Sequence, residues 1–323
     1  MIPAYVSGAI VYSNLLMLLS IGFTFAYLTA KVPNFALGGN AAIGIYVAFT
    51  VAKVVNVHPY WAVPVAMPVC GLASALIYKG VIQPLKRRNA GLISLSIATI
   101  AAEMMIFAGI NIYADALRGV AGEYTRQFML RSQDFEIVGL PGVLVVSTLL
   151  AVTIVLLLHA VLTKTKFGIA IRATVENDDL ASTLAINTEL VSLVSWFITG
   201  ALAGVAGSLF PMWFQAGPYT GTLILMAVFA ASVVGGMASI YGAIVGGYLV
   251  GLTQVLGTIF VMDRVGSWVA PYQPLVPLIV LFVVLLRAPE GLAGVAAKID
   301  IGRVREGLLR PFASATGKGD LDD

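Results

Sequence analysis

Long apolar runs without charge dominate the sequence and decide which folds are open to it. Residues 6–30 contain no charged side chain, and several later runs have a similar length. A helix needs about 20 apolar residues to cross the hydrocarbon core of a bilayer. Only 11 % of the residues are charged, whereas soluble domains average about 25 %. We therefore predict an all-α integral membrane protein, a polytopic helical bundle of about eight or nine spans.

Polar residues, prolines and glycines divide these runs into spans. The expected spans are 6–30, 35–52, 60–82, 91–112, 140–162, 190–214, two short spans or a re-entrant pair within 223–262, and 268–286. The second run is rich in glycine, so it is either a plain helix or a partly unwound or re-entrant segment. Residues 1–310 are interpreted as one transmembrane domain, and the polar residues 311–323 as a disordered tail.

Basic side chains gather in three connections, and cytoplasmic loops carry such an excess of Lys and Arg. The clusters are Lys86-Arg87-Arg88, then Lys164 with Lys166 and Arg172, and finally Arg303 with Arg305 and Arg310. We therefore expect the inner connection 163–189 and the C-terminus in the cytoplasm. The connection 113–139 carries mixed charge and is assigned to the outside. The N-terminus then lies outside, provided that the second run crosses.

The inner connection is predicted to form two short amphipathic helices that meet at Glu176-Asn177-Asp178. Phe167, Ile171 and Val175 recur at helical spacing before this turn, and Leu180, Ala181 and Leu184 share one face after it. Asn177 or Asp178 can cap the second helix. A helix lying on the lipid surface would need a strongly basic face. Because the turn is acidic, docking to a protein is favoured.

Glu103 lies inside the fourth expected span, where a carboxylate is costly and by default marks a functional site. A glutamate buried and hydrogen-bonded between helices is the structural alternative, and the sequence leaves both open. Cys70 is the one cysteine and is assigned to packing, and two histidines are too few for a histidine metal centre. No G-x-x-x-x-G-K-[ST] motif occurs, so this chain is not expected to bind ATP through such a loop. The G-x-x-x-G pairs 200/204, 242/246 and 247/251 are interpreted mainly as helix packing.

Three stretches follow one another in an order that is informative. They are Asn34-Phe35-Ala36 with Gly38 and Gly44-Ile45-Tyr46-Val47-Ala48; the loop 168–187 with Arg172-Ala173 and Ala181, followed by the glycine-rich run 200–207; and Gly235-Gly236-Met237-Ala238-Ser239-Ile240-Tyr241-Gly242-Ala243 with Gly246-Gly247. Together they resemble the branched-chain amino acid ABC transporter permease family of the LivH/LivM type, and LivH more closely. The resemblance covers residues 34 to 292.

The resemblance implies the membrane-spanning permease subunit of an ATP-driven importer for branched-chain or other amino acids. A second permease subunit, either a similar chain or another copy, would complete the pathway. Two cytoplasmic ATPase subunits would hold ATP and Mg²⁺, and an extracytoplasmic solute-binding protein would deliver the solute at a prokaryotic plasma membrane. No cofactor, metal or enzymatic activity is expected in this chain itself.

The resemblance also assigns candidate residues. The ATPase-coupling set is Phe167, Gly168, Arg172, Ala173, Glu176, Asn177, Ala181 and Leu184. The pathway candidates are Asn34, Gly38, Gly39, Asn40, Gly44, Tyr46, Glu103, Gly235, Gly236, Ser239 and Gly242. Broken helices at the glycine-rich segments could expose backbone to water, and ordinary packed kinks are the alternative reading.

The sequence departs from the family pattern at four positions, and the first two departures leave the solute open. Leu37 stands where the LivH type often has His, Gly39 stands where it often has an acid, and Ala185 and Ala238 replace usual glycines. The family also handles urea and short amides, so an importer of such solutes is one alternative. A proton-coupled secondary transporter that uses Glu103 is another, and an assembly scaffold or receptor is the non-transport alternative.

Overall fold

The computed structural model describes residues 3–137 and 139–294 of the chain. Its α-helices are α1 (Ala4–Ala30), α2 (Leu37–Phe49), α3 (Ala62–Ile77), α4 (Gln83–Arg87), α5 (Leu92–Ala121), α6 (Gly142–Lys164), α7 (Lys166–Glu176), α8 (Asp178–Thr183), α9 (Thr188–Leu209), α10 (Thr220–Gly235), α11 (Ile240–Val265) and α12 (Leu275–Arg287). Two short strands, β1 (Glu136–Ile137) and β2 (Leu140–Pro141), pair antiparallel. The basic cluster at 303–310 and the tail 311–323 lie outside the described residues.

Eight helices in the described part of the chain are long and apolar enough to cross a membrane. They are 4–30, 37–54, 59–87, 92–121, 142–164, 188–212, 240–265 and 275–294. π-helical turns join α2 to its continuation through Val54 and α3 to α4, and the shorter apolar helix α10 makes a ninth segment. The predicted all-α polytopic bundle is therefore confirmed.

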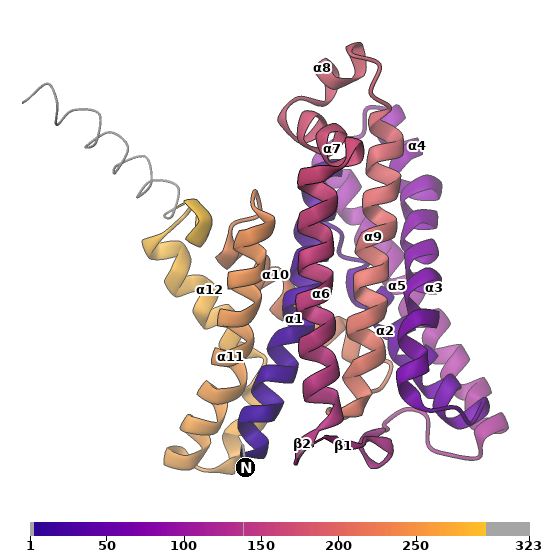
Figure 1. Ribbon diagram of the computed structural model, residues 1–323, viewed down its shortest axis with the longest axis vertical. Coiled ribbons are helices and arrows are strands. Elements are labelled where there is room, and N and C mark those ends of the chain that lie inside the picture. The colour runs from indigo at the N-terminus through magenta and orange to yellow at the C-terminus, as the bar shows by residue number, and fades with distance from the viewer. Residues whose placement is uncertain (1–2, 138, 295–323) are drawn as a thin grey trace, which may run out of the picture.

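Helix α1 lies at the centre of the bundle, and α12 lies at its edge (Figure 1). The most apolar 18-residue stretch of α1 is 94 % buried inside the protein. The corresponding stretch of the last span, 275–294, is only 11 % buried. Helices α6, α9, α10 and α11 all pack on α1. A charge-free helix of 27 residues can be surrounded in this way because it contains no side chain that must reach water.

Small residues allow the closest helix contacts. A side chain at Gly200 or Gly204 would collide with the backbone of α3 at Cys70 or Ala66. Gly247 and Gly251 lie equally close to Met17 and Ser13 of α1. The packing interpretation of the G-x-x-x-G pairs is thus confirmed, since each pair brings two backbones together.

Two helices begin inside the bundle after irregular segments. After α1 ends at Ala30, residues 31–36 turn back beside α5, where Thr99 Oγ1 donates to Pro33 O, and α2 then starts. After α9 and a 3-10 turn (Phe210–Met212), residues 213–219 pair with the outer loop through Phe128 and Ala216, and α10 then starts. Irregular backbone at this depth requires burial in protein. Asn34, Ala36 and Ala216 are indeed buried.

Three features differ from expectation. The run 223–262 does not form two short spans or a re-entrant pair, because α11 alone has 26 residues and is long enough to cross, while α10 is short. Helix α5 continues to Ala121 rather than ending near Ile112, because Ala114 and Leu117 on its added turns are buried against other elements, and Gly122 ends it at φ +66°. The last helix begins at Leu275 rather than Trp268, because Pro271 and Pro274 lie in and after a 3-10 turn that spans Ser267–Tyr272.

The two ends of the bundle differ in composition. Helices α4, α7 and α8 lie at one end, and the start of α1 lies at the opposite end with β1 and β2 (Figure 1). The basic residues at 86–88 and 164–172 belong to the first of these ends. That arrangement matches the expected separation of the N-terminus from the basic connections.

Candidate functional site

Glu103 of α5 reaches the first turn of α2. Its Oε2 accepts a hydrogen bond of 2.5 Å from the backbone N–H of Gly39, and its Oε1 accepts one of 3.3 Å from Thr222 Oγ1 of α10. Glu103 is the only charged residue between Leu92 and Ala114, and it lies midway between them. The carboxylate is therefore a shared acceptor for the starts of two helices, whose N-terminal ends carry partial positive charge.

The starts of α2 and α10 touch at two glycines. A Cβ on Gly38 would lie 2.6 Å from the carbonyl oxygen of Gly221, and a Cβ on Gly221 would collide with Gly38 O in return. A Cβ on Gly39 would lie 2.6 Å from Glu103 Oε2. We call Gly38, Gly39, Glu103, Gly221 and Thr222 the helix junction. Any larger side chain at its glycines would force the helices apart.

Two polar candidates beside the junction have no internal partner. Asn34 and Asn40 are fully buried, and neither side-chain amide has a hydrogen-bond partner within the described residues. An unpaired buried amide costs roughly 1–3 kcal/mol. Together with Glu103, these asparagines make the beginning of α2 unusually polar for a membrane interior.

The second glycine-rich segment lies at the other end of α10. Gly235 and Gly242 bring the end of α10 against the start of α11, and Gly236 turns the chain with φ +98°. Ser239 caps α11 by accepting a hydrogen bond of 3.1 Å from Gly242 N–H. Helix α10 has 16 residues, so this turn lies about 24 Å from the junction along its axis. The structure therefore does not gather the two sets of pathway candidates into one site.

Gly44 and Tyr46 lie further along α2. A Cβ on Gly44 would lie 2.8 Å from Gly204 O of α9, so this glycine serves a close helix contact. Tyr46 is buried, and its hydroxyl donates a hydrogen bond of 2.9 Å to Thr125 O. Both residues thus face protein neighbours.

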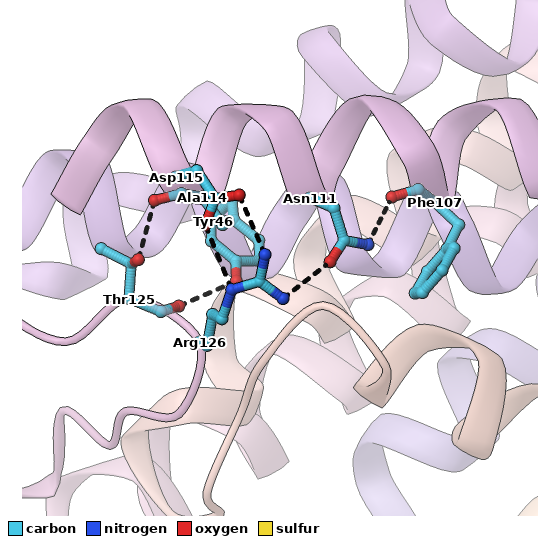
Figure 2. Close-up of polar contacts among 7 residues, drawn as sticks. All are labelled: Tyr46, Phe107, Asn111, Ala114, Asp115, Thr125 and Arg126. Atoms are coloured by element: carbon cyan, nitrogen blue, oxygen red, sulfur yellow. Dashed lines mark hydrogen bonds and ion pairs between the residues drawn. The ribbon is translucent and has the colours of Figure 1, made fainter.

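The outer loop after α5 is held against α2 and α5 (Figure 2). Arg126 donates from Nη2 to Asp115 Oδ2 at 2.9 Å and from Nη1 to Asn111 Oδ1 at 3.3 Å. Thr125 Oγ1 donates to Ala114 O at 2.7 Å. These contacts fix the loop whose residue Phe128 pairs with Ala216, just before α10. We missed this network from the sequence, although Asp115 and Arg126 are opposite charges near the end of a helix.

A cavity of about 410 Å³ lies between α1, α10, α11 and the turn before α12. Apolar side chains form most of its lining, together with the neutral polar residues Tyr12, Gln254, Thr258 and Gln273. Thr220 and Ile224 of α10 line it as well. None of the pathway candidates from the sequence lies in this lining. The only sequence signal that could have predicted this cavity is the occurrence of scattered neutral polar residues within apolar helices.

The connection after α6 forms two short helices, as expected. We call residues 167–187 the elbow. Asn177 caps α8 by accepting a hydrogen bond of 3.0 Å from Leu180 N–H, and Asn187 caps α9 through Leu190 N–H at 2.9 Å. The predicted break at Glu176-Asn177-Asp178 and the predicted cap are therefore confirmed.

The first half of the elbow is anchored to three spans. Ile171 packs with Phe25 of α1 and Val191 of α9. Arg172 Nη1 donates to Leu162 O of α6 at 2.5 Å, and Lys31 Nζ donates to Val175 O at 3.1 Å. Gly168 allows the tight turn, because a Cβ there would collide with Leu162 O. A displacement of α7 would therefore act on α1, α6 and α9 together.

The second half of the elbow projects beyond the spans (Figure 1). The side chains of Leu180 and Leu184 are 59 % and 68 % exposed, whereas Ala181 is buried. Among the remaining coupling candidates, Phe167 and Ala173 are partly buried, and Glu176 is exposed. Leu180 and Leu184 lie one helical turn apart, so they form a small apolar face on the part of the elbow that projects from the bundle.

Comparison with known proteins decides the family. The profile of the family described as branched-chain amino acid transport system / permease component matches residues 5–285. The chain belongs to this family. No solved structure matches the permease.

Several curated sequences are similar to the permease over most of its length. A protein of Methanocaldococcus jannaschii named probable branched-chain amino acid transport permease protein LivH is 41 % identical over 89 % of this chain and 91 % of its own. The Escherichia coli K12 high-affinity branched-chain amino acid transport system permease protein LivH is 30 % identical over 86 % of this chain and 90 % of its own. The resemblance seen in the sequence is thus confirmed, including its closeness to LivH.

Family membership places the chain among multi-pass transport subunits rather than enzymes. Such a permease works with other components of a transport system. This family assignment disfavours the proton-coupled secondary transporter. In addition, the carboxylate of Glu103, which that alternative requires as proton carrier, already accepts hydrogen bonds from Gly39 and Thr222.

Proposed function

We propose that this permease is the membrane subunit of an ATP-driven importer of branched-chain amino acids. The single observation that carries the proposal is the elbow: it is anchored to three spans and presents Leu180 and Leu184 on a projecting helix. The names of the LivH relatives support an amino acid as solute. Of the departures from the family pattern, Gly39 belongs to the junction and Leu37 directly precedes Gly38 of the junction, so both can affect which amino acid is preferred.

The elbow is the proposed docking site for an ATPase subunit in the cytoplasm. Its base contacts α1, α6 and α9, so movement imposed at α8 is passed to the centre of the bundle. Helix α9 reaches α2 at Gly44 and Gly204, close to the junction. A switch of this kind requires only that the ATPase contacts differ between two states.

Helix α10 is the proposed moving element beside the pathway. It starts at the junction, lines the cavity through Leu223 and Ile224, and ends at the turn around Gly236, where φ is +98°. A helix bounded by glycine contacts at both ends can tilt without breaking its own hydrogen bonds. We propose that a second permease, either a similar chain or another copy, completes the pathway on the other side.

The remaining partners follow from this arrangement. Two cytoplasmic ATPases would hold ATP and Mg²⁺, and an extracytoplasmic protein would deliver the amino acid to the end that carries β1 and β2. In this proposal the elbow and the C-terminus are cytoplasmic, which agrees with the basic residues near α4 and α7.

The test is co-purification and transport with the ATPases, the binding protein and the second permease that the proposal requires. Replacing Leu184 by Glu should release the ATPases and abolish ATP-dependent leucine uptake into proteoliposomes, because a charge replaces an apolar contact. Val120→Glu is the matched control, since Val120 is 71 % exposed and lies near the C-terminal end of α5, at the end of the bundle away from the elbow. Uptake by the permease alone, or unchanged ATPase binding after Leu184→Glu, would contradict the proposal.

A further inference from the structure

A second cavity lies at the inner end, beside the elbow. It has a volume of about 510 Å³ and lies between α4, the start of α5, α8 and the start of α9. Sites for small molecules usually measure about 300–1,000 Å³. Unlike the cavity near Tyr12, this one is lined mainly by polar side chains and carries both signs of charge. We call it the inner pocket.

One ion pair forms a fixed wall of the inner pocket. Arg87 of α4 donates from Nε and Nη2 to the two carboxylate oxygens of Glu189, at 2.9 and 2.7 Å. Gln83 Nε2 adds a hydrogen bond of 2.8 Å to Glu189 Oε2. Because these donors occupy Glu189 on both oxygens, the charges of this pair are largely compensated by each other.

Two further charges in the lining lack such a partner. Lys86 is partly buried, and Asp178 belongs to the first turn of α8. The three ion pairs in the described part of the chain are Lys53–Glu123, Arg87–Glu189 and Arg126–Asp115, and they include neither residue. Lys86 and Asp178 thus bring one cation and one anion, neither held in an ion pair among the described residues, to the same cavity.

The apolar part of the lining lies on the bundle side. Tyr78 and Leu95 line the pocket and are 2 % and 4 % exposed. A ligand that matches this lining carries a carboxylate, an ammonium group and a compact aliphatic side chain. Free branched-chain amino acids have these three features.

We propose that the inner pocket binds a free branched-chain amino acid from the cytoplasm and thereby restrains the elbow. Lys86 takes the α-carboxylate, Asp178 takes the α-ammonium, and the side chain packs towards Tyr78 and Leu95. The bound amino acid then connects α8 to α4. It stabilises the state in which these helices are close, and opposes the displacement of α8 that drives transport.

This inference rests on the proposed function, because it assigns product inhibition to the same importer. Accumulated product would slow its own uptake, and the pocket would respond to the cytoplasmic concentration alone. Lys86 and Asp178 lie on separate elements, so each supplies one half of the recognition.

The first experiment measures uptake by the complete complex in proteoliposomes that contain ATP and increasing leucine in the lumen facing the ATPases. Luminal leucine should lower the initial rate severalfold in the unaltered protein. Lys86→Gln should remove this inhibition while retaining uptake into an empty lumen, and Lys86→Arg should restore it. Lys79→Gln is the matched control, since Lys79 is exposed in the same segment and lies outside the lining. Luminal leucinol, which lacks the carboxylate, should inhibit much less.

The second experiment measures binding of labelled leucine to the purified complex without its binding protein. Lys86→Gln should weaken binding at least tenfold, and Lys79→Gln should leave it unchanged. Uptake that ignores luminal leucine, or equal binding by Lys86→Gln, would overturn the inference. A complex that shows no ATP-dependent uptake into an empty lumen would instead overturn the proposed function, and the binding result would still decide on the pocket.

Discussion

The carboxylate of Glu103 accepts a hydrogen bond from the backbone amide of Gly39 at 2.5 Å. Gly39 lies in the first turn of α2, where helical N–H groups have no acceptor within the helix. Glu103 lies midway along the otherwise uncharged part of α5, about 16 Å from Leu92 along the helix axis. A charge in the middle of a span therefore serves the end of a neighbouring helix, and it reaches α10 as well through Thr222.

This relationship separates two substitutions of Glu103. Glu103→Ala removes the acceptor and leaves a buried N–H unpaired, so we expect a loss of about 1–3 kcal/mol in stability. Glu103→Gln keeps a carbonyl oxygen in the same place and should retain most of the stability and transport. Thermal unfolding and leucine uptake measure both effects. Stable Glu103→Gln protein that transports nothing would favour a proton-carrying role for Glu103 instead.

A second prediction compares two contacts of the outer loop. Tyr46→Phe removes the donor to Thr125 O, which belongs to a fully buried residue, and should cost about 1–3 kcal/mol. Arg126→Gln breaks an ion pair whose side chains are 43 % and 57 % exposed, and such pairs contribute little because water and salt screen them. Melting temperatures of the two variants should therefore differ clearly. A larger decrease for Arg126→Gln than for Tyr46→Phe would contradict the structure in Figure 2.

A third prediction concerns Asn14 at the centre of α1. Its Nδ2 donates to Thr148 Oγ1 at 2.9 Å and to Ser147 Oγ at 3.2 Å, and its Oδ1 accepts from Tyr248. Polar contacts between membrane helices are worth about 0.6 kcal/mol each on average. Asn14→Leu should thus lower stability by about 1–2 kcal/mol, as measured by unfolding in mixed micelles. Ser96→Ala, which removes only a bond within α5, is the control and should change little.

The sequence predicted the bundle well because its signals are local. Charge-free runs, the division at residues 235–239 and the acidic break at Asn177 each act within one segment, and all appear in the structure. The family departure at Ala185 also has a local consequence. Ala185 adopts φ +60°, a left-handed conformation that favours glycine.

Other boundaries depended on partners that lie far apart in the chain. The outer turns of α5 form because Ala114 and Leu117 are buried against other elements. Asp115 pairs with Arg126 of the outer loop, and Arg87 at the end of α4 pairs with Glu189 of α9. Two isolated charges in a sequence do not reveal which of several opposite charges they will meet. The junction was unpredictable for the same reason, since Gly38 and Gly221 are separated by most of the chain.

The amino-acid sequence by itself determined the membrane class, the order of the spans, the two-helix elbow and the family, because hydrophobic length, helix capping and motif order are properties of single segments. Only the tertiary structure decided the role of Glu103 as an acceptor shared by α2 and α10, the separation of the two glycine-rich segments by α10, and the mixed charge of the inner pocket. These features arise from the approach of distant helices, and that approach is governed by packing across the whole bundle.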